Sequence, residues 1–431
     1  FQMGQGFLDA VMSGRLSSED LAGITLGGSV MWPSMMFLSG IVMAATPIIA
    51  QLNGAGRITE VGAIVRQGLW LALAAAAILI AFLWNAAPLY GWIGVDPVAA
   101  AIGVPYLRAT CFGMPAIMCF FLLRYLCEGL GRTKPAMVIA GLALLLKGVL
   151  NYAFIYGAFG APRLGGVGCG WSTAIVAWFE LACIVFVVTR RFYARAGVFQ
   201  AFSFPQWHVI ARFLRIGLPI GATLFFEVGI YSMVTLLIGQ LGVKVVAAHQ
   251  IAANFNAVTF MIPLSLGMAA AIRVGYHVGA ERLERARTAA GVAMTVAFVY
   301  AVIAALLLFA FRFEVAALYT TEPDVLELAA TILLFVAAYQ FVDDTQVTAI
   351  GALRGYKDTR VPMFIALIGY WVIALPVATT FAYGWILAEP WGVFGFWTGL
   401  TVGLGTVAAM VSMRLWRLSQ DESRVRILSS G

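Results

Sequence analysis

Charged residues are scarce in this sequence. Asp, Glu, Lys and Arg together make up 11% of the 431 residues, whereas hydrophobic residues make up 62%. Soluble domains usually carry about 25% charged residues, and a chain this apolar would aggregate in water. The shortage of charge therefore excludes a water-soluble globular protein, and lipid is the expected solvent for most of the surface.

Motifs for enzyme chemistry are missing as well. There is no GxxxxGK(S/T) loop to cradle a phosphate, and the glycine-rich stretch at 165–170 enters an apolar segment, where it favours close helix packing. The three histidines are scattered, and the five cysteines lack CxxC or Cys/His metal spacing. We find no Ser–His–Asp arrangement either. These absences argue against nucleotide-driven transport, a metal centre and a membrane-embedded enzyme, so we expect neither catalysis nor a cofactor.

Long apolar segments are abundant instead. A helix needs about 20 apolar residues to cross a bilayer, and eleven segments meet that length. They lie at 22–46, 61–87, 98–127, 135–158, 167–189, 214–240, 244–271, 288–311, 325–353, 361–384 and 393–416. The apolar stretch at 1–14 is too short to span. Because the chain starts with Phe, we expect this stretch to be the end of a first helix, which predicts an all-α membrane protein with twelve transmembrane helices.

Lysine and arginine are distributed unevenly among the connections. Of the 27 in the chain, 21 fall on one set of alternate loops. The opposite set holds four: Arg15, Arg163, Lys244 and Arg312. Positive residues collect on the cytoplasmic side of a membrane, so both termini are expected in the cytoplasm, with short loops outside. The same bias explains the net charge of +7, and no basic arm with interleaved aromatics indicates a nucleic-acid partner.

The sequence also carries an internal repeat. A shift of 225 residues lays 22–57 over 247–282, and both segments end in Gly-Ala-x-Arg. A shift of 226 aligns 131–137 with 357–363, and Gly166, Val167 and Trp171 with Gly392, Val393 and Trp397. The offset spans six helices, and an even number returns the chain to the same side of the membrane. The two halves are therefore expected to share one topology.

This repeat predicts two pseudo-symmetric lobes of six helices. We expect an N-terminal lobe at 1–189, a cytoplasmic linker at 190–212, a C-terminal lobe at 213–418 and a cytoplasmic tail at 419–431. Two homologous lobes around a central site are typical of transporters. Without a nucleotide-binding motif, an ion gradient is the remaining energy source, and it requires groups that take up a cation inside the membrane.

Acidic residues within the apolar segments are the candidates for that cation. A charge at the centre of a membrane helix costs about 2.5–3.5 kcal/mol on insertion scales, and it is tolerated mainly where it faces a cavity or a partner. The acids away from the loops are Asp9, Glu180, Glu227, Asp343 and Asp344. Glu180 stands alone in its segment, and pairing with a basic group is an equally open reading of it.

Three of these acids lie on polar stripes with helical spacing. The stripes are Gln2, Gln5 and Asp9; Thr223, Glu227 and Tyr231; and Tyr339, Asp343 and Gln346. Two further polar pairs, each four residues apart, are Gln250 with Asn254 and Lys147 with Asn151. For the amides and hydroxyls, simple hydrogen bonding to neighbouring helices is as good an explanation as ligand binding.

Asp343 and Asp344 are adjacent in an otherwise apolar segment. Consecutive helical residues point about 100° apart, so the two carboxylates cannot face the same partner. Asp343 shares a face with Tyr339 and Gln346, whereas Asp344 shares one with Gln340. We expect Asp343 to take the cation. For Asp344, a protonated carboxyl, a place in a central cleft and a basic partner all stay open.

Several stretches resemble the multidrug and toxic compound extrusion (MATE) family, in its bacterial NorM branch. They are DAVMSGRLSSEDLAG, TPIIAQLNGAGR, AAHQIA, PLSLGMAAAIRVG and YQFVDDTQVTAIGALRGYKD, and the resemblance covers the whole chain. It implies twelve helices in two lobes around a V-shaped cleft, and antiport in which amphipathic organic cations leave in exchange for Na⁺ or H⁺. The partners it implies are cationic drugs and dyes and the lipid bilayer, with a monomeric protein.

The resemblance also implies roles for individual residues. The family's acids in helices 1, 7 and 10 match Asp9, Glu227 and Asp343, which are expected to take the coupling cation within a bacterial inner membrane. Na⁺ is expected at Glu227 and Asp343, with Tyr339 beside them. Expected drug-contacting residues are Asp9, Ser29, Gln250 and Phe260, and on the same polar stripes Tyr231, Asn254 and Gln2. Phe260 lacks an oxygen, so it would contact a cation through its ring face.

Lys147 departs from the family pattern, because an uncharged polar residue is expected there. Pairing of Lys147 with an acid would argue against Asp9 acting alone as a proton switch. Taken together, the residues predict multidrug efflux by alternating access, with drug and coupling cation sharing the membrane carboxylates. The alternative is a lipid-linked precursor flippase of the same superfamily, which would need clustered arginines rather than acids in its helices.

Overall fold

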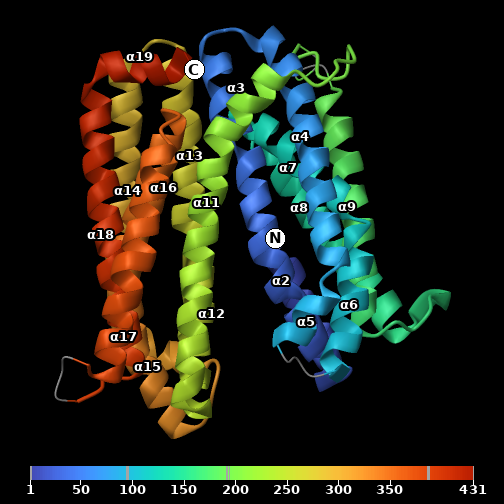
Figure 1. Cartoon of the computed structure of the whole chain (residues 1–431), viewed down its shortest axis with the longest axis vertical. Helices are drawn as coiled ribbons and strands as arrows, with labels where there is room; N and C mark the ends of the chain where they lie inside the picture. The colour runs from blue at the N-terminus through green and yellow to red at the C-terminus, as the bar shows by residue number, and fades with distance from the viewer. Residues whose placement is uncertain (1, 94–96, 191–192, 194, 386–388, 431) are drawn as a thin grey trace. The chain divides into compact units, whose positions relative to one another are not determined.

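The structure, a computed structural model, describes residues 2–93, 97–190, 193, 195–385 and 389–430, and its regular elements there are all helical (Figure 1). Within these described ranges, ten helices are long and apolar enough to cross a membrane, and an eleventh crossing results if α6 (Pro97–Cys111) and α7 (Met114–Gly129) form one bent span. These spans correspond to the eleven predicted segments. The all-α, multi-pass class is therefore confirmed, and α1 (Gln2–Gly14) is indeed too short to span.

The chain forms two compact units, and the N-terminal unit comprises residues 1–53 and 57–221. Its further helices are α2 (Ser18–Met43), α3 (Ala45–Gly54), α4 (Ile58–Trp84), α5 (Ala87–Ile93), α8 (Lys134–Tyr156), the short η1 (Ala158–Gly160), α9 (Gly166–Val188) and the start of α11 (Trp207–Ile238). Helix α8 packs against both α1 and α9. The predicted linker at 190–212 stays a prediction, and residues 191, 192 and 194 in it lie outside the described residues.

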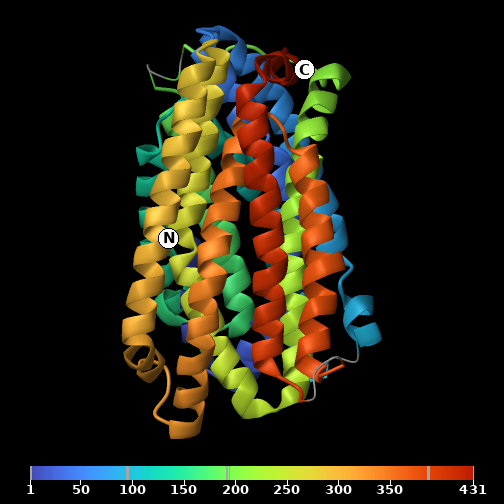
Figure 2. The same ribbon diagram turned by 90° about the vertical axis from the view of Figure 1, so that its left-hand side faces the viewer.

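The C-terminal unit comprises residues 54–56 and 222–431. Besides the rest of α11, it contains η2 (Gly239–Leu241), α12 (Val243–Thr259), α13 (Met261–Gly279), α14 (Leu283–Ala317), α15 (Pro323–Gly355), α16 (Arg360–Leu367), η3 (Ile368–Ala374), α17 (Leu375–Tyr383), α18 (Val393–Gln420) and α19 (Glu422–Ser430). Helix α15 contacts α12, α13, α14 and α18, and Figure 2 shows α14, α15 and α18 running side by side. Residues of α15 are therefore the most enclosed of this unit.

The predicted internal repeat is visible in the backbone dihedrals of the two halves of the sequence. Gly56 (φ 73°) and Glu281 (φ 56°) are both left-handed and lie 225 residues apart. Gly131 (φ 76°) and Lys357 (φ 60°) are both left-handed and lie 226 residues apart. A positive φ is uncommon for Glu or Lys. Its recurrence at the predicted offsets therefore supports two halves of the same topology.

The repeat contains one extra residue in the C-terminal unit. Helix α8 spans 23 residues, whereas its counterpart, Arg360–Tyr383, spans 24. The additional residue is taken up by η3, a π-helix, in which each turn holds one residue more than in an α-helix. Downstream of it, the left-handed Gly165 corresponds to Gly392, an offset of 227. The predicted alignment of Gly166 with Gly392 is therefore shifted by one residue.

The loop between α1 and α2 is tied to the start of α9 by one carboxylate. Ser17 caps α2 by accepting a hydrogen bond from the Asp20 backbone N–H (2.9 Å), and the Ser17 hydroxyl donates to Asp20 Oδ2 (2.8 Å). Asp20 Oδ1 accepts from the backbone N–H of Gly166 (2.6 Å), the first residue of α9. Because a negative charge is stabilising near a helix N-terminus, Asp20 supports two helix starts.

Replacing Asp20 with Ala should therefore destabilise the N-terminal unit. We expect a loss of about 1–2 kcal/mol, the upper range for removing a helix cap, seen as a lower melting temperature of the purified protein in detergent. Glu19→Ala removes the neighbouring exposed acid and is the matched control, with little expected change. Equal destabilisation by both substitutions would contradict this role of Asp20.

Candidate functional site

The predicted acids of the C-terminal unit lie together in its interior. On α15, Tyr339, Asp343 and Asp344 are 6%, 3% and 0% exposed. Glu227 on α11 is half-buried. Asp343 interacts electrostatically with both Glu227 and Asp344, so the structure brings two helices' acids into one cluster.

Tyrosine hydroxyls surround this pair of acids. Tyr231, one turn beyond Glu227 on α11, interacts with Asp343. Tyr339, one turn before Asp343 on α15, interacts with both Asp343 and Glu227. The sequence-predicted residues Glu227, Tyr231, Tyr339 and Asp343 thus converge, as their helical spacing indicates. We name these four residues, together with Tyr370, the acid cluster.

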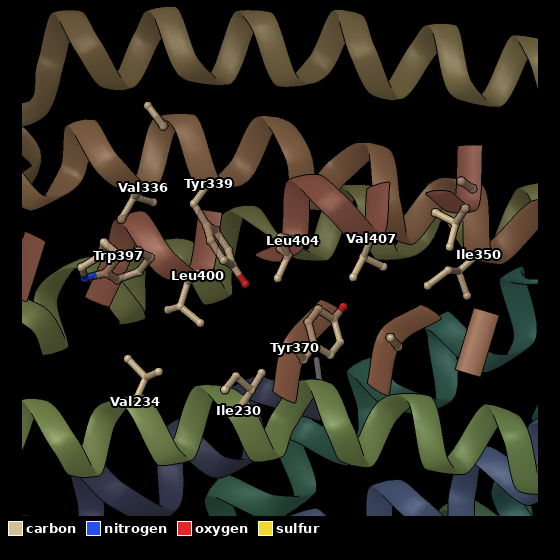
Figure 3. Close-up of a cluster of buried hydrophobic side chains, with 14 of the residues drawn as sticks. Ile230, Val234, Val336, Tyr339, Ile350, Tyr370, Trp397, Leu400, Leu404 and Val407 are labelled. Atoms are coloured by element: carbon tan, nitrogen blue, oxygen red, sulfur yellow. The ribbon is translucent and has the colours of Figure 1, made fainter. Parts of the chain in front are cut away.

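Tyr370 is the member of the acid cluster that sequence reasoning missed. It is fully buried and interacts with both Glu227 and Asp343. Figure 3 shows Tyr339 projecting from α15 and Tyr370 from η3 into an interior that Ile230 and Leu404 also line. Its position depends on the π-helix, which rotates the residues after it relative to an ideal α-helix. Single-turn π segments are frequent at functional sites, but nothing in the sequence IGYWVIA reveals one.

Several oxygens of the acid cluster have no hydrogen-bond partner within the described part of the chain. They include Asp343 Oδ1 and the Tyr231 hydroxyl. Buried polar atoms are nearly always satisfied in native proteins, and exceptions point to a water or an ion. Carboxylate and hydroxyl oxygens suit a hard cation or a proton. Among the described residues, no group of three or more His, Cys, Asp or Glu is placed to hold a metal ion.

Aromatic rings enclose the acid cluster on its α18 side. Trp397 packs edge-on against Tyr339 (ring centroids 5.5 Å apart) and against Tyr231 (6.2 Å). His249 of α12 lies 5.7 Å from the same indole, and its Nε2 is 3.1 Å from the Thr235 hydroxyl. These contacts hold both tyrosines in place beside the acids.

Asp344 has surroundings different from those of Asp343. It interacts with Tyr300 of α14, and neither of its carboxylate oxygens has a hydrogen-bond partner among the described residues. Gln340, predicted on the same face, is also buried and lies beside Tyr300. The two adjacent acids therefore face different neighbours, as the helical geometry predicts, and no basic group is recorded against Asp344 in this part of the chain.

The N-terminal unit holds a second polar network around Asp9. Asn151 Nδ2 donates to Asp9 Oδ1 (2.7 Å), and the Lys147 ammonium lies 3.1 Å from the same oxygen. Asp9 is 9% exposed, Lys147 1% and Asn151 0%. The pairing of Lys147 with an acid, considered from the sequence, is thus what the structure shows.

Gln5 and Glu180 form a separate contact in this unit. The Gln5 amide donates to Glu180 Oε1 (3.2 Å), which places Glu180 beside the polar stripe of α1. Glu180 also interacts electrostatically with two basic residues, Arg124 and Lys147, which supports the reading in which it pairs with a basic group. Gln2 lies in α1, but its side chain is outside the described residues.

Four further residues are predicted to contact the drug. Ser29 on α2 is exposed, and its hydroxyl donates to the Leu26 carbonyl (2.7 Å). Gln250 and Asn254 on α12 are exposed and hydrogen-bonded to each other (3.3 Å). Phe260 is half-buried at the break between α12 and α13. Their roles in drug binding stay predictions.

Comparisons with known proteins give a consistent result. The MatE family model matches residues 1–153 and 219–380. The chain is 42% identical over 427 residues to the multidrug resistance protein NorM of Vibrio vulnificus, covering 99% of this chain and 94% of the relative. It is 44% identical over 414 residues to the multidrug resistance protein PmpM of Pseudomonas aeruginosa, covering 96% and 87%.

Solved structures share the fold. The eukaryotic MATE transporter AtDTX14 matches with a TM-score of 0.89 at 19% sequence identity, covering 100% of this chain and 94% of that one. The Vibrio cholerae MATE transporter VcmN in its bent form matches with a TM-score of 0.87 at 18% identity, covering 98% and 94%.

Proposed function

The chain belongs to the MATE family of multidrug transporters, and from that premise we propose that it exports amphipathic organic cations in exchange for Na⁺ or H⁺. It is a multi-pass membrane transporter for drugs and not an enzyme. The named relatives are multidrug resistance proteins, which gives the lipid-linked precursor flippase no support. The proposed steps concern the coupling ion, the charge of the drug and the residues that bind them.

The observation that carries the proposal is the acid cluster. Two acids from different helices, Glu227 and Asp343, interact in the interior of one unit. Asp343 Oδ1 has no hydrogen-bond partner among the described residues. Burying ionised carboxylates is costly unless they are paired, so a cation or a proton lowers the free energy of this site. The same charge attracts a cationic drug.

Coupling then follows from competition for the carboxylates. On the cytoplasmic side, ionised Glu227 and Asp343 favour a cationic drug, and Tyr231, Tyr339 and Tyr370 offer ring faces to it. On the outer side, Na⁺ or H⁺ takes the carboxylates, removes their charge and weakens drug binding. A ligand shifts a conformational equilibrium only by its differential affinity for the two states. Sharing of the acids is therefore the simplest way to link the two fluxes.

The transport test uses the purified chain in proteoliposomes loaded with a cationic dye. Either a Na⁺ gradient or a proton gradient is imposed, one at a time, and dye release is followed by fluorescence. We expect release with at least one gradient, and none for a neutral dye of similar size. Release that needs neither gradient, or that ignores the dye's charge, would refute antiport of organic cations; translocation of a lipid-linked sugar instead would favour the flippase.

We also propose that the transporter is monomeric and that both termini are cytoplasmic. The bias of lysine and arginine toward one set of loops supports this orientation. A C-terminal epitope should then be accessible to antibody in inside-out vesicles and protected in right-side-out ones; the reverse pattern would overturn the orientation.

A further inference from the structure

The Lys147 ammonium lies in a complete shell of oxygen acceptors. Its Nζ is 3.1 Å from Asp9 Oδ1 and donates to the Cys169 carbonyl (3.2 Å) and to the Thr173 hydroxyl. An ammonium carries three N–H donors and no acceptor. Three acceptors therefore satisfy all three donors, and the side chain is 1% exposed.

The surrounding side chains hold this shell in place. Asn151 donates to Asp9 Oδ1 (2.7 Å), and the Ser172 hydroxyl donates to Asn151 Oδ1 and contacts the Cys169 carbonyl (2.9 Å). Asn151 and Ser172 are fully buried. Helices α1, α8 and α9 each contribute to the shell, so its oxygens are positioned by the packing of the unit rather than by one flexible loop.

A carboxylate, a hydroxyl and a backbone carbonyl are also the ligands that a hard metal cation takes from a protein. The ammonium and such a cation would compete for the same atom, Asp9 Oδ1. We infer that Lys147 is a tethered cation that occupies a monovalent-cation site at Asp9 and keeps Na⁺ out of it.

The acid cluster provides the contrast within the same chain. Asp9 Oδ1 has two partners, Asn151 and Lys147, whereas Asp343 Oδ1 has none among the described residues. An exchangeable cation therefore has a free oxygen at Asp343 and an occupied one at Asp9. Lys147 thereby determines which unit takes the coupling ion. That last step rests on the proposed antiport, whereas the occupancy of the Asp9 site does not.

Binding of ²²Na⁺ to the full-length protein in detergent tests the inference without transport. The parent for this test is Glu227→Gln/Asp343→Asn, which silences the acid cluster. We expect no Na⁺ binding that depends on Asp9 in this parent. Adding Lys147→Ala should raise bound ²²Na⁺ by about tenfold or more. The apparent affinity of the Asp9 site for Na⁺ rises in proportion to the fraction of protein in which the lysine ammonium no longer occupies it.

Two further variants and one competing compound make the result specific. Asp9→Asn added to the Lys147→Ala protein should abolish the new Na⁺ binding. Lys147→Arg keeps a cation in the shell and should show no gain. Ethylammonium, a small analogue of the missing side chain, should compete with ²²Na⁺ for binding to the Lys147→Ala protein. In the parent it should displace no ²²Na⁺.

Two results would overturn the inference. One is a folded, monodisperse Lys147→Ala protein that binds no more Na⁺ than the parent. The other is Na⁺ binding to the parent protein that is lost on adding Asp9→Asn, which would show that Lys147 does not exclude the ion. This second result needs no lysine variant, so it stays informative if Lys147→Ala does not fold. Failure of antiport itself would appear in the dye assay and leave these binding results unaffected.

Discussion

Glu227→Gln or Asp343→Asn should each abolish cation-driven dye efflux while leaving the protein folded. Each substitution keeps the volume of the side chain and removes only its charge. The loss follows because Glu227 and Asp343 interact in a buried cluster, where the attraction for a cation is strong. A loss of 1.4 kcal/mol in cation binding is already about tenfold in affinity, and we expect efflux to fall at least that far, to the level of empty liposomes.

Asp324→Asn is the matched control for this experiment. Asp324 lies on the same helix, α15, but its side chain is 73% exposed and pairs with Lys244, which is 64% exposed. Exposed ion pairs contribute little, so efflux and stability should stay near those of the unmodified protein. Undiminished efflux in both the Glu227 and the Asp343 variants would exclude the acid cluster as the coupling site.

The double variant adds information about how the two acids act. Residues that work as one unit show strongly non-additive effects. The informative measurement is the affinity for the coupling cation: if Glu227 and Asp343 hold one cation between them, the double variant should bind it no more weakly than either single variant. Two multiplying losses would instead indicate two independent cation sites.

Helical spacing was sufficient to predict most of the acid cluster. Tyr231 and Tyr339 lie one turn from Glu227 and Asp343, so the helical repeat alone places each tyrosine beside its acid. Only the packing of α11 beside α15 could not be predicted in this way. The separate surroundings of Asp343 and Asp344 follow from the same angle between neighbours. These features are local, and local geometry is what a sequence pattern reports.

The place of Tyr370 in the acid cluster and the Lys147–Asp9 contact could not be predicted from local helical spacing. Tyr370 reaches the cluster because η3 adds one residue to its helix, and that register change has no signature in the residues themselves. Lys147 on α8 is far from Asp9 on α1 in the sequence, yet α1 and α8 pack together and bring the two side chains into contact. Both depend on packing between distant segments, which periodicity does not describe.

The family-like stretch GALRGYKD at 351–358 shapes the end of α15 more than it supplies acids to the cluster. A Cβ on Gly355 would lie 2.8 Å from the Ala271 carbonyl oxygen, Lys357 has a left-handed φ of 60°, and Asp358 accepts from Arg414 Nε at 2.7 Å. Each of these residues shapes the end of α15 and the turn after it. The stretch therefore identifies the family largely through backbone geometry. Asp343 lies about two turns earlier on the same helix, and Arg354 of the stretch interacts electrostatically with Glu227.

A second large effect is expected at a glycine of α15, because the position of Asp343 depends on how the helix that carries it packs. Gly351 of α15 faces Gly267 of α13, and a Cβ on Gly351 would lie 2.2 Å from the Gly267 carbonyl oxygen and 2.5 Å from its Cα. Those atoms are backbone and cannot rotate away, so Gly351→Ala has to push two helices apart. Overpacking of this kind costs about 1–3 kcal/mol, and a larger side chain should prevent folding.

Gly351→Ala should therefore lower both the melting temperature and the efflux rate, because α15 carries Asp343 two turns from the forced contact. Gly291→Ala is the control: nothing lies within 4 Å of a Cβ there, and Ala exceeds Gly in helix propensity by about 1 kcal/mol, so stability should hold or rise. If Gly351→Ala lost stability but kept full coupling, the acid cluster would tolerate movement of its helix. Loss of coupling in well-folded Gly351→Ala protein would instead show that close α13–α15 packing sets the position of Asp343.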